Sequence, residues 1–303
     1  MTAQSRRRFL IQSSRVGAAA LIPAWGWRRA FANPLGRPIG IQLYTVNGPM
    51  REDPAGTLKK LREIGFREVE SAGLGKLSAQ EFRRRLDDAG LACPSAHLQF
   101  DVDNLGSTFE TAHALGAAYA ASGSLPAPAV DGKPAAASSK RSMSLDEAKR
   151  TAALVNRIGE AAKRAGLQYV YHNHDFEFAD QGGGAFGYDV LLRESDPELV
   201  KFEIDCGWMI FAGYDPIKYF EKYPNRIPLI HVKDFLAHDK SAGNAAPMLG
   251  AELGRGVVDY KPIFAVAGKA GLQHYFVEQE GPFSRMDQLQ AARVDYEYLH
   301  SMG

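Results

Sequence analysis

Imidazole, ammonium and carboxylate side chains gather at four places in the second half of the chain, each at the end of a short apolar run. The side chains concerned are His172, His174, Glu177, Glu203, Asp205, His231, Lys233, Glu278 and Glu280. Burying so many ionisable groups together is costly unless a cation or a substrate compensates their charge. Oxygen ligands with one or two imidazoles and no thiolate cluster suit Mn²⁺, Mg²⁺, Co²⁺ or Zn²⁺. The pattern therefore predicts a divalent metal centre.

Each of these residues alone also has an ordinary structural explanation. A single His on a strand is more often a buried structural residue than a metal ligand. Asp205 is placed to cap the turn that follows it, and Glu278 to pair with an arginine of a neighbouring loop. The combination favours a site, because strand alternation puts both polar residues of each apolar run on one face.

From residue 38 onward, eight short β-branched or aromatic runs alternate with amphipathic stretches, which is typical of βα units around a parallel sheet. The expected strands are 39–46, 68–72, 92–98, 119–122, 168–174, 201–205, 229–233 and 274–279. The clearest expected helices are 55–64, 79–89, 145–165 and 262–270, each closely followed by a glycine. Eight units in about 270 residues predict an α/β fold with one domain, a (β/α)₈ TIM barrel. A doubly wound open sheet is the alternative, but no glycine-rich phosphate fingerprint follows the first strand.

A barrel of this kind determines where the polar side chains lie. The carboxyl ends of all its strands meet at one face, so the four polar runs converge on one rim. Segment 126–141, rich in Ala, Pro, Ser and Lys, is predicted to be a long loop after the fourth strand. Two interpretations of this loop stay open, a lid over the rim and a disordered surface insertion.

Six strings carry a family resemblance. They are IGIQLYTV at 39–46, YHNHDFEF at 171–178, FEIDCGW at 202–208, HVKD at 231–234, ELGRGVVDY at 252–260 and VEQE at 277–280. Together they resemble the sugar phosphate isomerase/epimerase family, the xylose-isomerase-like TIM barrels, from about residue 38 to the C-terminus. The resemblance is specific for the fold and the metal site but not for the substrate. Ketose epimerases, hydroxypyruvate isomerase, inosose dehydratase and endonuclease IV all belong to that family.

The resemblance implies one divalent ion held by a Glu, an Asp, a His and a Glu from the ends of strands five to eight. Asp205, His231 and Glu278 match the last three of these ligands. At strand five the sequence departs from the family, because a His-Asn-His string stands where the Glu is usual. We expect Glu177, slightly farther along, as the fourth ligand, with His172 or His174 as the alternative.

The resemblance also implies substrate contacts. Gln42, Glu70 and His97, near the ends of the early strands, match substrate-contacting positions of the family. Arg255 is a further expected substrate-binding residue. Trp208 is placed to stack on a sugar face, and a role in the core is an equal alternative.

The resemblance implies a divalent-metal-dependent isomerase or epimerase. Such an enzyme acts on a sugar or keto-sugar through a metal-stabilised enediolate. Glu278 or one of His172 and His174 is the expected base, and Lys233 either neutralises developing oxyanion charge or pairs with Glu203. One alternative is a lyase or dehydratase that acts on a 3-keto-glycoside or an inosose-like ring. The other is a non-catalytic periplasmic sugar-binding barrel.

Composition narrows the classes of partner. The chain of 303 residues carries 36 Lys and Arg against 35 Asp and Glu, so no excess of positive charge favours nucleic acid. No run of about 18 or more uncharged apolar residues is present, which argues against a membrane-spanning helix. Two cysteines are too few for a disulfide framework. We expect a small-molecule carbohydrate as the partner, and the oligomeric state stays open.

The first 32 residues have the layout of an export signal. Three arginines at 6–8 precede an apolar segment, Ala-Phe-Ala at 30–32 forms a cleavage site, and SRRRFL at 5–10 resembles the twin-arginine motif. We therefore expect a signal peptide at 1–32 and a barrel domain at 33–303 that is periplasmic or secreted, without membrane association after cleavage. Cleavage removes six arginines and no acidic residue, leaving 30 basic against 35 acidic residues and a net charge of −5. This charge argues against a nuclease.

Overall fold

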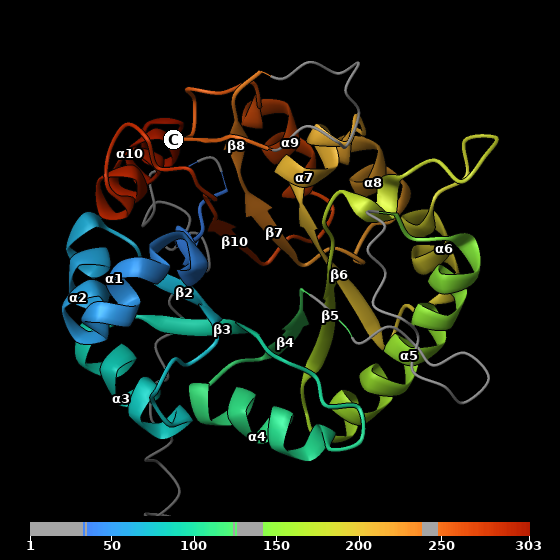
Figure 1. Cartoon of the computed structure of the whole chain (residues 1–303), viewed down its shortest axis with the longest axis horizontal. Helices are drawn as coiled ribbons and strands as arrows, with labels where there is room; N and C mark the ends of the chain where they lie inside the picture. Colours follow the sequence, from blue (N-terminus) through green and yellow to red (C-terminus); the bar gives the residue numbers. More distant parts are fainter. Residues whose placement is uncertain (1–32, 34, 124, 126–141, 238–247) are drawn as a thin grey trace, which may run out of the picture.

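The computed structural model describes residues 33, 35–123, 125, 142–237 and 248–303. The export signal and the long loop predicted from the sequence lie outside these residues. Within them, eight parallel strands form a closed barrel in the order β1-β10-β7-β6-β5-β4-β3-β2, surrounded by helices (Figure 1). The predicted (β/α)₈ fold is therefore confirmed. None of the helices in the described part of the chain is long and apolar enough to cross a membrane.

The elements of the barrel alternate along the chain. The barrel strands are β1 (Gly40–Gln42), β2 (Glu68–Ala72), β3 (Ala92–His97), β4 (Tyr119–Ser122), β5 (Gln168–His172), β6 (Val200–Asp205), β7 (Leu229–Val232) and β10 (His274–Val277). The helices are α1 (Asn47–Glu52), α2 (Pro54–Ile64), α3 (Ala79–Ala89), α4 (Leu105–Leu115), α5 (Leu145–Arg164), α6 (Gly187–Glu194), α7 (Cys206–Phe211), α8 (Pro216–Lys222), α9 (Tyr260–Ala267) and α10 (Gln288–Ser301). Two 3₁₀ helices, η2 (Leu43–Val46) and η3 (Phe176–Phe178), lie after β1 and β5.

Several strands are shorter than the sequence predicts, and two of these ends shape the rim. Strand β1 stops at Gln42, whose side-chain oxygen accepts the backbone N–H of Tyr44 at 3.2 Å and begins η2. Strand β5 stops at His172 rather than His174. The backbone N–H of His174 donates to Glu177 Oε2 at 3.0 Å, so the chain leaves the barrel wall at that point.

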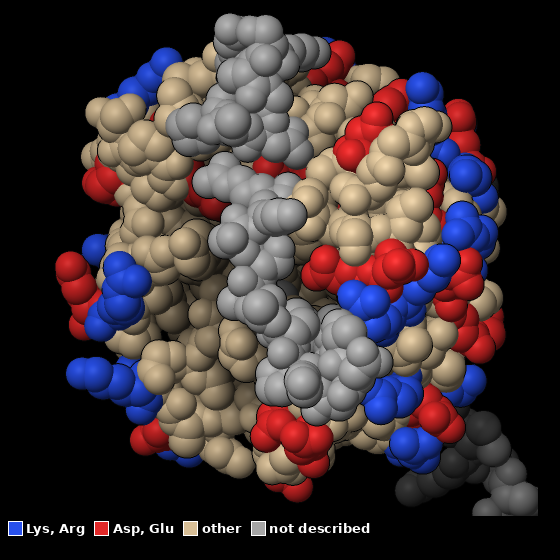
Figure 2. Space-filling view, turned by 45° about the vertical axis from the view of Figure 1, so that its right-hand side comes forward, with Lys and Arg blue, Asp and Glu red and all other residues tan. Residues whose placement is uncertain are grey.

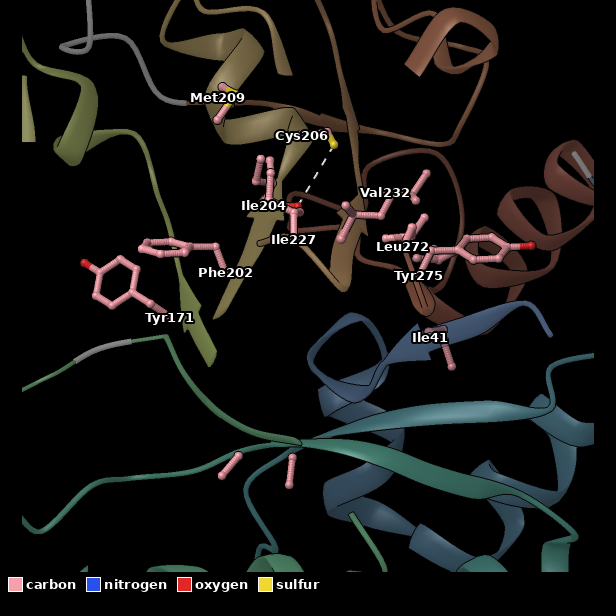
Figure 3. Close-up of a cluster of buried hydrophobic side chains, with 14 of the residues drawn as sticks. Ile41, Tyr171, Phe202, Ile204, Cys206, Met209, Ile227, Val232, Leu272 and Tyr275 are labelled. Atoms are coloured by element: carbon pink, nitrogen blue, oxygen red, sulfur yellow. Dashed lines mark hydrogen bonds between the residues drawn. The ribbon is translucent and has the colours of Figure 1, made fainter. Parts of the chain in front are cut away.

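Alternation along the strands separates an apolar outer layer from an interior that is polar at the carboxyl ends of the strands. A separate apolar cluster of inward-facing residues consists of Ala121, Val170, Leu229 and Phe276. Phe202, Ile204 and Val232 belong to the main buried core between strands and helices, and Figure 3 shows them among their apolar neighbours. The residues between them, such as Glu203 and His231, point the other way, into the barrel. The strands are thus held by their outer faces, which leaves their inner faces at the carboxyl ends for polar groups.

A short ribbon comes after strand β7 at the rim. β8 (Asp234–Phe235) pairs antiparallel with β9 (Gly250–Ala251). The Asp234 carboxylate accepts five backbone N–H groups at 2.9 to 3.1 Å, from Phe235, Gly254, Gly256, Val257 and Val258. These bonds tie the loop after β9 to the residue beside Lys233.

Charge on the outer surface is mixed. On the face in Figure 2, basic and acidic side chains of the described residues alternate in small groups. In that view the described residues form no continuous basic patch of the kind that nucleic acids bind.

Candidate metal centre

Four buried donors meet where the last strands of the barrel end. They are His172 at the end of β5, Asp205 at the end of β6, His231 in β7 and Glu278 after β10. One donor atom of each lies within 4.8 Å of the others. We call these four residues the rim group. Two imidazoles and two carboxylates at this spacing match the donor chemistry of a divalent cation.

Lys233 lies against the carboxylates of the rim group. Its Nζ is 2.7 Å from Asp205 Oδ2, 2.9 Å from Glu278 Oε2 and 2.6 Å from Glu280 Oε1. Trp208 donates its indole N–H to Glu280 Oε1 at 3.1 Å, and its ring centre is 5.1 Å from Lys233 Nζ. The three carboxylates around this ammonium do not include Glu203, the partner expected from the sequence.

Close approach of the chain to Lys233 depends on one glycine. A Cβ placed on Gly207, in α7, would lie 2.8 Å from Lys233 Cβ, closer than real side chains come. Gly207 therefore lets helix α7 pack directly against the lysine.

A second set of polar side chains lies deeper in the barrel, because Glu203 precedes Asp205 by two residues on β6. Glu203 Oε2 is 2.7 Å from His97 Nε2 and 3.3 Å from His172 Nδ1. Glu203 Oε1 is 3.4 Å from His231 Nε2, which also lies 2.6 Å from Glu70 Oε2. One donor atom each of His97, His172, Glu203 and His231 lies within 4.8 Å of the others, so the two sets share two imidazoles.

Gln42 and Glu70, expected to contact substrate, are buried in this deeper set. Gln42 Nε2 donates to Glu70 Oε2 at 2.9 Å, and the Ser95 hydroxyl donates to Glu70 Oε1. Both expected residues are at most 1% exposed. Their polar atoms are hydrogen-bonded to other protein groups, and Glu70 contacts His231 rather than facing open space. His97, in contrast, keeps a side chain that is 18% exposed.

Glu177, expected as the fourth ligand, lies apart from the rim group. Its carboxylate accepts the Tyr171 hydroxyl at 2.9 Å and the backbone N–H of His174 at 3.0 Å. Burial raises the pKa of Glu177 to about 8. Helix η3 turns this side chain back against strand β5, and His172 stands at the strand-five place among the four donors.

Three other expected residues occupy the surroundings. His174 packs against Phe176 and Trp208, with ring centres 5.9 and 6.2 Å away. Trp208 is partly buried beside Lys233, with one polar contact to Glu280. Arg255 is 45% exposed and lies 3.6 Å from Glu252 Oε2, outside the rim group.

The charges of the site are strongly displaced from their usual states. Burial, reinforced by the positive charge of His231, lowers the pKa of His172 well below its usual value. Burial and Lys233 lower the pKa of His174 to about 4. Burial opposes ionisation of Glu278, yet the charges of Lys233 and His231 outweigh it and hold the pKa of Glu278 well below its usual range. At neutral pH His172 and His174 are thus neutral beside ionised Glu278. His231 is positively charged, because Glu203 and Glu278 outweigh the effect of burial and hold its pKa well above the usual value.

Sequence reasoning missed one residue of the deeper set. Ser95 is an ordinary small polar residue in a strand, and nothing in its neighbourhood marks it. Glu203 is among the polar residues expected at the rim, but the only specific role predicted for it is pairing with Lys233. Its shared face with Asp205 on β6 was a signal that it points into the barrel, but the three imidazoles around it come from three other strands.

The chain matches known enzymes over part of its length. The inosose dehydratase of Geobacillus thermodenitrificans is 32% identical over 135 residues, which are 41% of this chain and 43% of that protein. The inosose dehydratase of Clostridium tetani is 31% identical over 167 residues, 51% of this chain and 54% of that protein. The chain thus spans about half the length of the curated relatives that it matches.

Solved structures match over nearly the whole barrel. A sugar phosphate isomerase/epimerase from Parabacteroides distasonis has a TM-score of 0.69 and 25% identity, covering 88% of this chain and 94% of that one. An L-ribulose 3-epimerase has a TM-score of 0.63 at 15% identity, with 88% and 94% covered. A Mycobacterium smegmatis barrel protein in complex with magnesium has a TM-score of 0.62 at 20% identity, with 89% and 97% covered. The last two show likeness of fold alone.

A family model described as xylose isomerase-like TIM barrel matches residues 58–301, which is most of the chain. Together with the closed barrel and the donors at its rim, this match shows that the chain belongs to the xylose isomerase-like TIM barrel family.

Proposed function

We propose that the protein is a divalent-metal-dependent lyase that eliminates the group on the carbon β to a carbonyl, which is water in an inosose-like ring and the aglycone alcohol in a 3-keto-glycoside. The observation that carries the proposal is the rim group, four buried donors within 4.8 Å of one another. The names of the curated relatives, inosose dehydratases, support elimination as the outcome.

The donors of the rim group fit a cation, since they combine two carboxylates with two imidazoles in a buried site. A divalent cation held there would supply positive charge to the carbonyl and neighbouring hydroxyl oxygens of a substrate.

Side chains around the rim group carry out the proton transfers. Glu278 is ionised and at the rim, so it is placed to take the proton from the carbon next to the carbonyl. His174 is neutral at pH 7 and lies beyond the rim group beside Trp208. This position suits proton transfer at the leaving group. Lys233 holds Asp205 and Glu278 in place and keeps Glu278 ionised.

An isomerase or epimerase is the second candidate, and the structural likeness to a sugar phosphate isomerase/epimerase favours it. Both reactions begin with the same proton abstraction and differ in the second step. An epimerase returns a proton to the opposite face, whereas a lyase expels the leaving group on the carbon β to the carbonyl. A sugar-binding barrel without chemistry would need neither step.

Proton NMR in D₂O distinguishes the three possibilities. The full chain, loaded with Mn²⁺, Co²⁺, Zn²⁺ or Mg²⁺ in turn, is incubated with an inosose, a 3-keto-glucoside and L-ribulose. We expect loss of the proton next to the carbonyl together with a dehydrated dicarbonyl or enone product from the inosose, or an enone product and free aglycone alcohol from the 3-keto-glucoside. Exchange with stereochemical inversion and no elimination would favour the epimerase. Binding without any exchange would contradict both reactions.

A further inference from the structure

The donor that strand five contributes to the rim group is an imidazole. The family resemblance leads one to expect a carboxylate there, yet His172 occupies the place and the nearby carboxylate of Glu177 is bonded elsewhere. The rim group accordingly has two nitrogen and two oxygen donors and only two carboxylate charges. Imidazole donors suit zinc, copper, iron and nickel, whereas carboxylate, carbonyl and water donors suit magnesium.

Lys233 reduces the remaining negative charge further. Its ammonium lies 2.7 Å from Asp205 Oδ2 and 2.9 Å from Glu278 Oε2, so both carboxylates of the rim group already share a positive neighbour. Mg²⁺ depends on the charge of oxygen ligands and gains little from nitrogen. A site with this charge balance is therefore poor for Mg²⁺.

Glu203 lies behind both imidazoles of the rim group. Its Oε2 lies 3.3 Å from His172 Nδ1, and its Oε1 lies 3.4 Å from His231 Nε2. A histidine that binds a metal usually directs its other ring N–H at a carboxylate, which fixes the tautomer. His172 Nδ1 makes no hydrogen bond to the described residues, and a proton on it faces the Glu203 carboxylate, which leaves Nε2 for a metal. His231 lies between two carboxylates, with Nε2 2.6 Å from Glu70 Oε2 and Nδ1 2.9 Å from Glu278 Oε2, and a metal bound at Nδ1 would displace the proton there.

We infer that His172, oriented by Glu203, is the residue that makes the rim group select zinc- or cobalt-like cations over magnesium. Glu203 is a positioning residue, since it acts through the two imidazoles. The inference rests on the proposed function in one respect, that the rim group holds a cation.

Metal binding to the full chain tests the inference without any assay of activity. Wild type, His172→Glu and Glu203→Gln are stripped with a chelator, and dissociation constants for Zn²⁺, Co²⁺ and Mg²⁺ are measured by competition. Protein sites in general bind Zn²⁺ more tightly than Mg²⁺, so the diagnostic quantity is the change in the ratio between variants. We expect His172→Glu to lower the preference for Zn²⁺ over Mg²⁺ by about tenfold or more, and Glu203→Gln to weaken Zn²⁺ binding by about 10- to 100-fold.

The matched control is His300→Asn, which removes an exposed imidazole on α10, far from the rim. It should leave all three constants unchanged. X-ray absorption of Zn²⁺ bound to wild type gives a second readout that needs no variant, and we expect two imidazole ligands. A single imidazole, or an unchanged Zn²⁺ to Mg²⁺ ratio in a folded His172→Glu, would overturn the inference and leave the proposed function standing. A wild type that binds no divalent cation would overturn both.

Discussion

The ammonium of Lys233 is the least expected charge in the site, because it is fully buried among three carboxylates. Each of Asp205, Glu278 and Glu280 lies within 2.9 Å of it. A buried ammonium is stable only when such partners compensate its lost hydration. Burial raises the pKa of Asp205 to about 6, although Lys233 opposes the shift.

Replacing Asp205 by a neutral residue tests whether its charge contributes to metal binding. Asp205→Asn should leave the barrel folded, because Asn keeps the oxygen that accepts the Trp208 backbone N–H at 2.8 Å. Metal affinity should fall by at least about tenfold, since a neutral amide gives up the charge attraction. Equilibrium dialysis with elemental analysis measures this. Asp88→Asn, an exposed change on α3, is the control, and equal metal content in the two variants would remove Asp205 from the ligand set.

Glu278 and His174 differ in their expected roles in proton transfer. Glu278→Gln should reduce exchange of the substrate proton next to the carbonyl by about 10²- to 10⁴-fold, the usual cost of losing a general base. His174→Asn should leave that exchange measurable while slowing formation of the elimination product. Deuterium incorporation and product formation, followed together by NMR with metal content matched, separate the two steps. Full exchange in Glu278→Gln would assign the base to another residue.

At the scale of elements, the ribbon formed by β8 and β9 depends on one carboxylate. Asp234→Asn turns one of two accepting oxygens into a donor, which faces backbone N–H groups that then lack an acceptor. We expect a loss of about 1–3 kcal/mol in unfolding free energy and faster amide exchange at 254–258. Asp215→Asn, which caps α8 through a single N–H, should cost far less. Equal effects of the two variants would show that Asp234 does not organise the loop.

Helix α10 carries a titrating group against the same loop. Burial raises the pKa of Asp295 to about 8, and its carboxylate accepts the Leu253 N–H at 2.7 Å. The folded protein therefore holds this proton more tightly than the unfolded chain, so the stability it contributes is full below about pH 4 and is lost as pH rises toward 8. Asp295→Asn keeps the acceptor and does not titrate. Its unfolding free energy relative to wild type should rise between pH 5 and pH 9 in denaturant titrations, and a constant difference would contradict this.

At the scale of the whole molecule, closure of the barrel brings residues from early and late strands into one interior. Gln42 from β1, Glu70 from β2 and Ser95 from β3 contact one another. Their network reaches the late strands through the bond between Glu70 and His231. Such contacts exist only in the completed barrel.

We propose that residues 1–32 are removed on export and that changing Arg6 and Arg7 together to Lys blocks it, because the translocon reads that pair. The fraction of protein in the periplasm or medium measures the effect. Changing Arg28 and Arg29 to Lys is the control with the same chemistry in the same segment. Unchanged export of the first double variant would remove the twin-arginine interpretation.

The pattern of amino acids was sufficient for the closed barrel and for three of the four rim-group members. Apolar runs alternating with amphipathic stretches specify βα units, and the parallel barrel then forces strand ends to one rim. The places of Asp205, His231 and Glu278 at those ends predict polar residues of the rim, and the family resemblance identified these three as expected ligands. Local sequence carries this information because strand alternation is a property of a few consecutive residues.

Tertiary structure alone decided the fourth donor and the supports of the site. Glu177 is only five residues after His172, and the early end of β5 with the bond from Tyr171 turns its carboxylate away. The roles of Glu70 and Glu203 depend on partners 161 and 106 residues away in the chain. Which side chains meet inside a barrel depends on the register between strands, and that register is set by packing of the whole closed sheet rather than by any one segment.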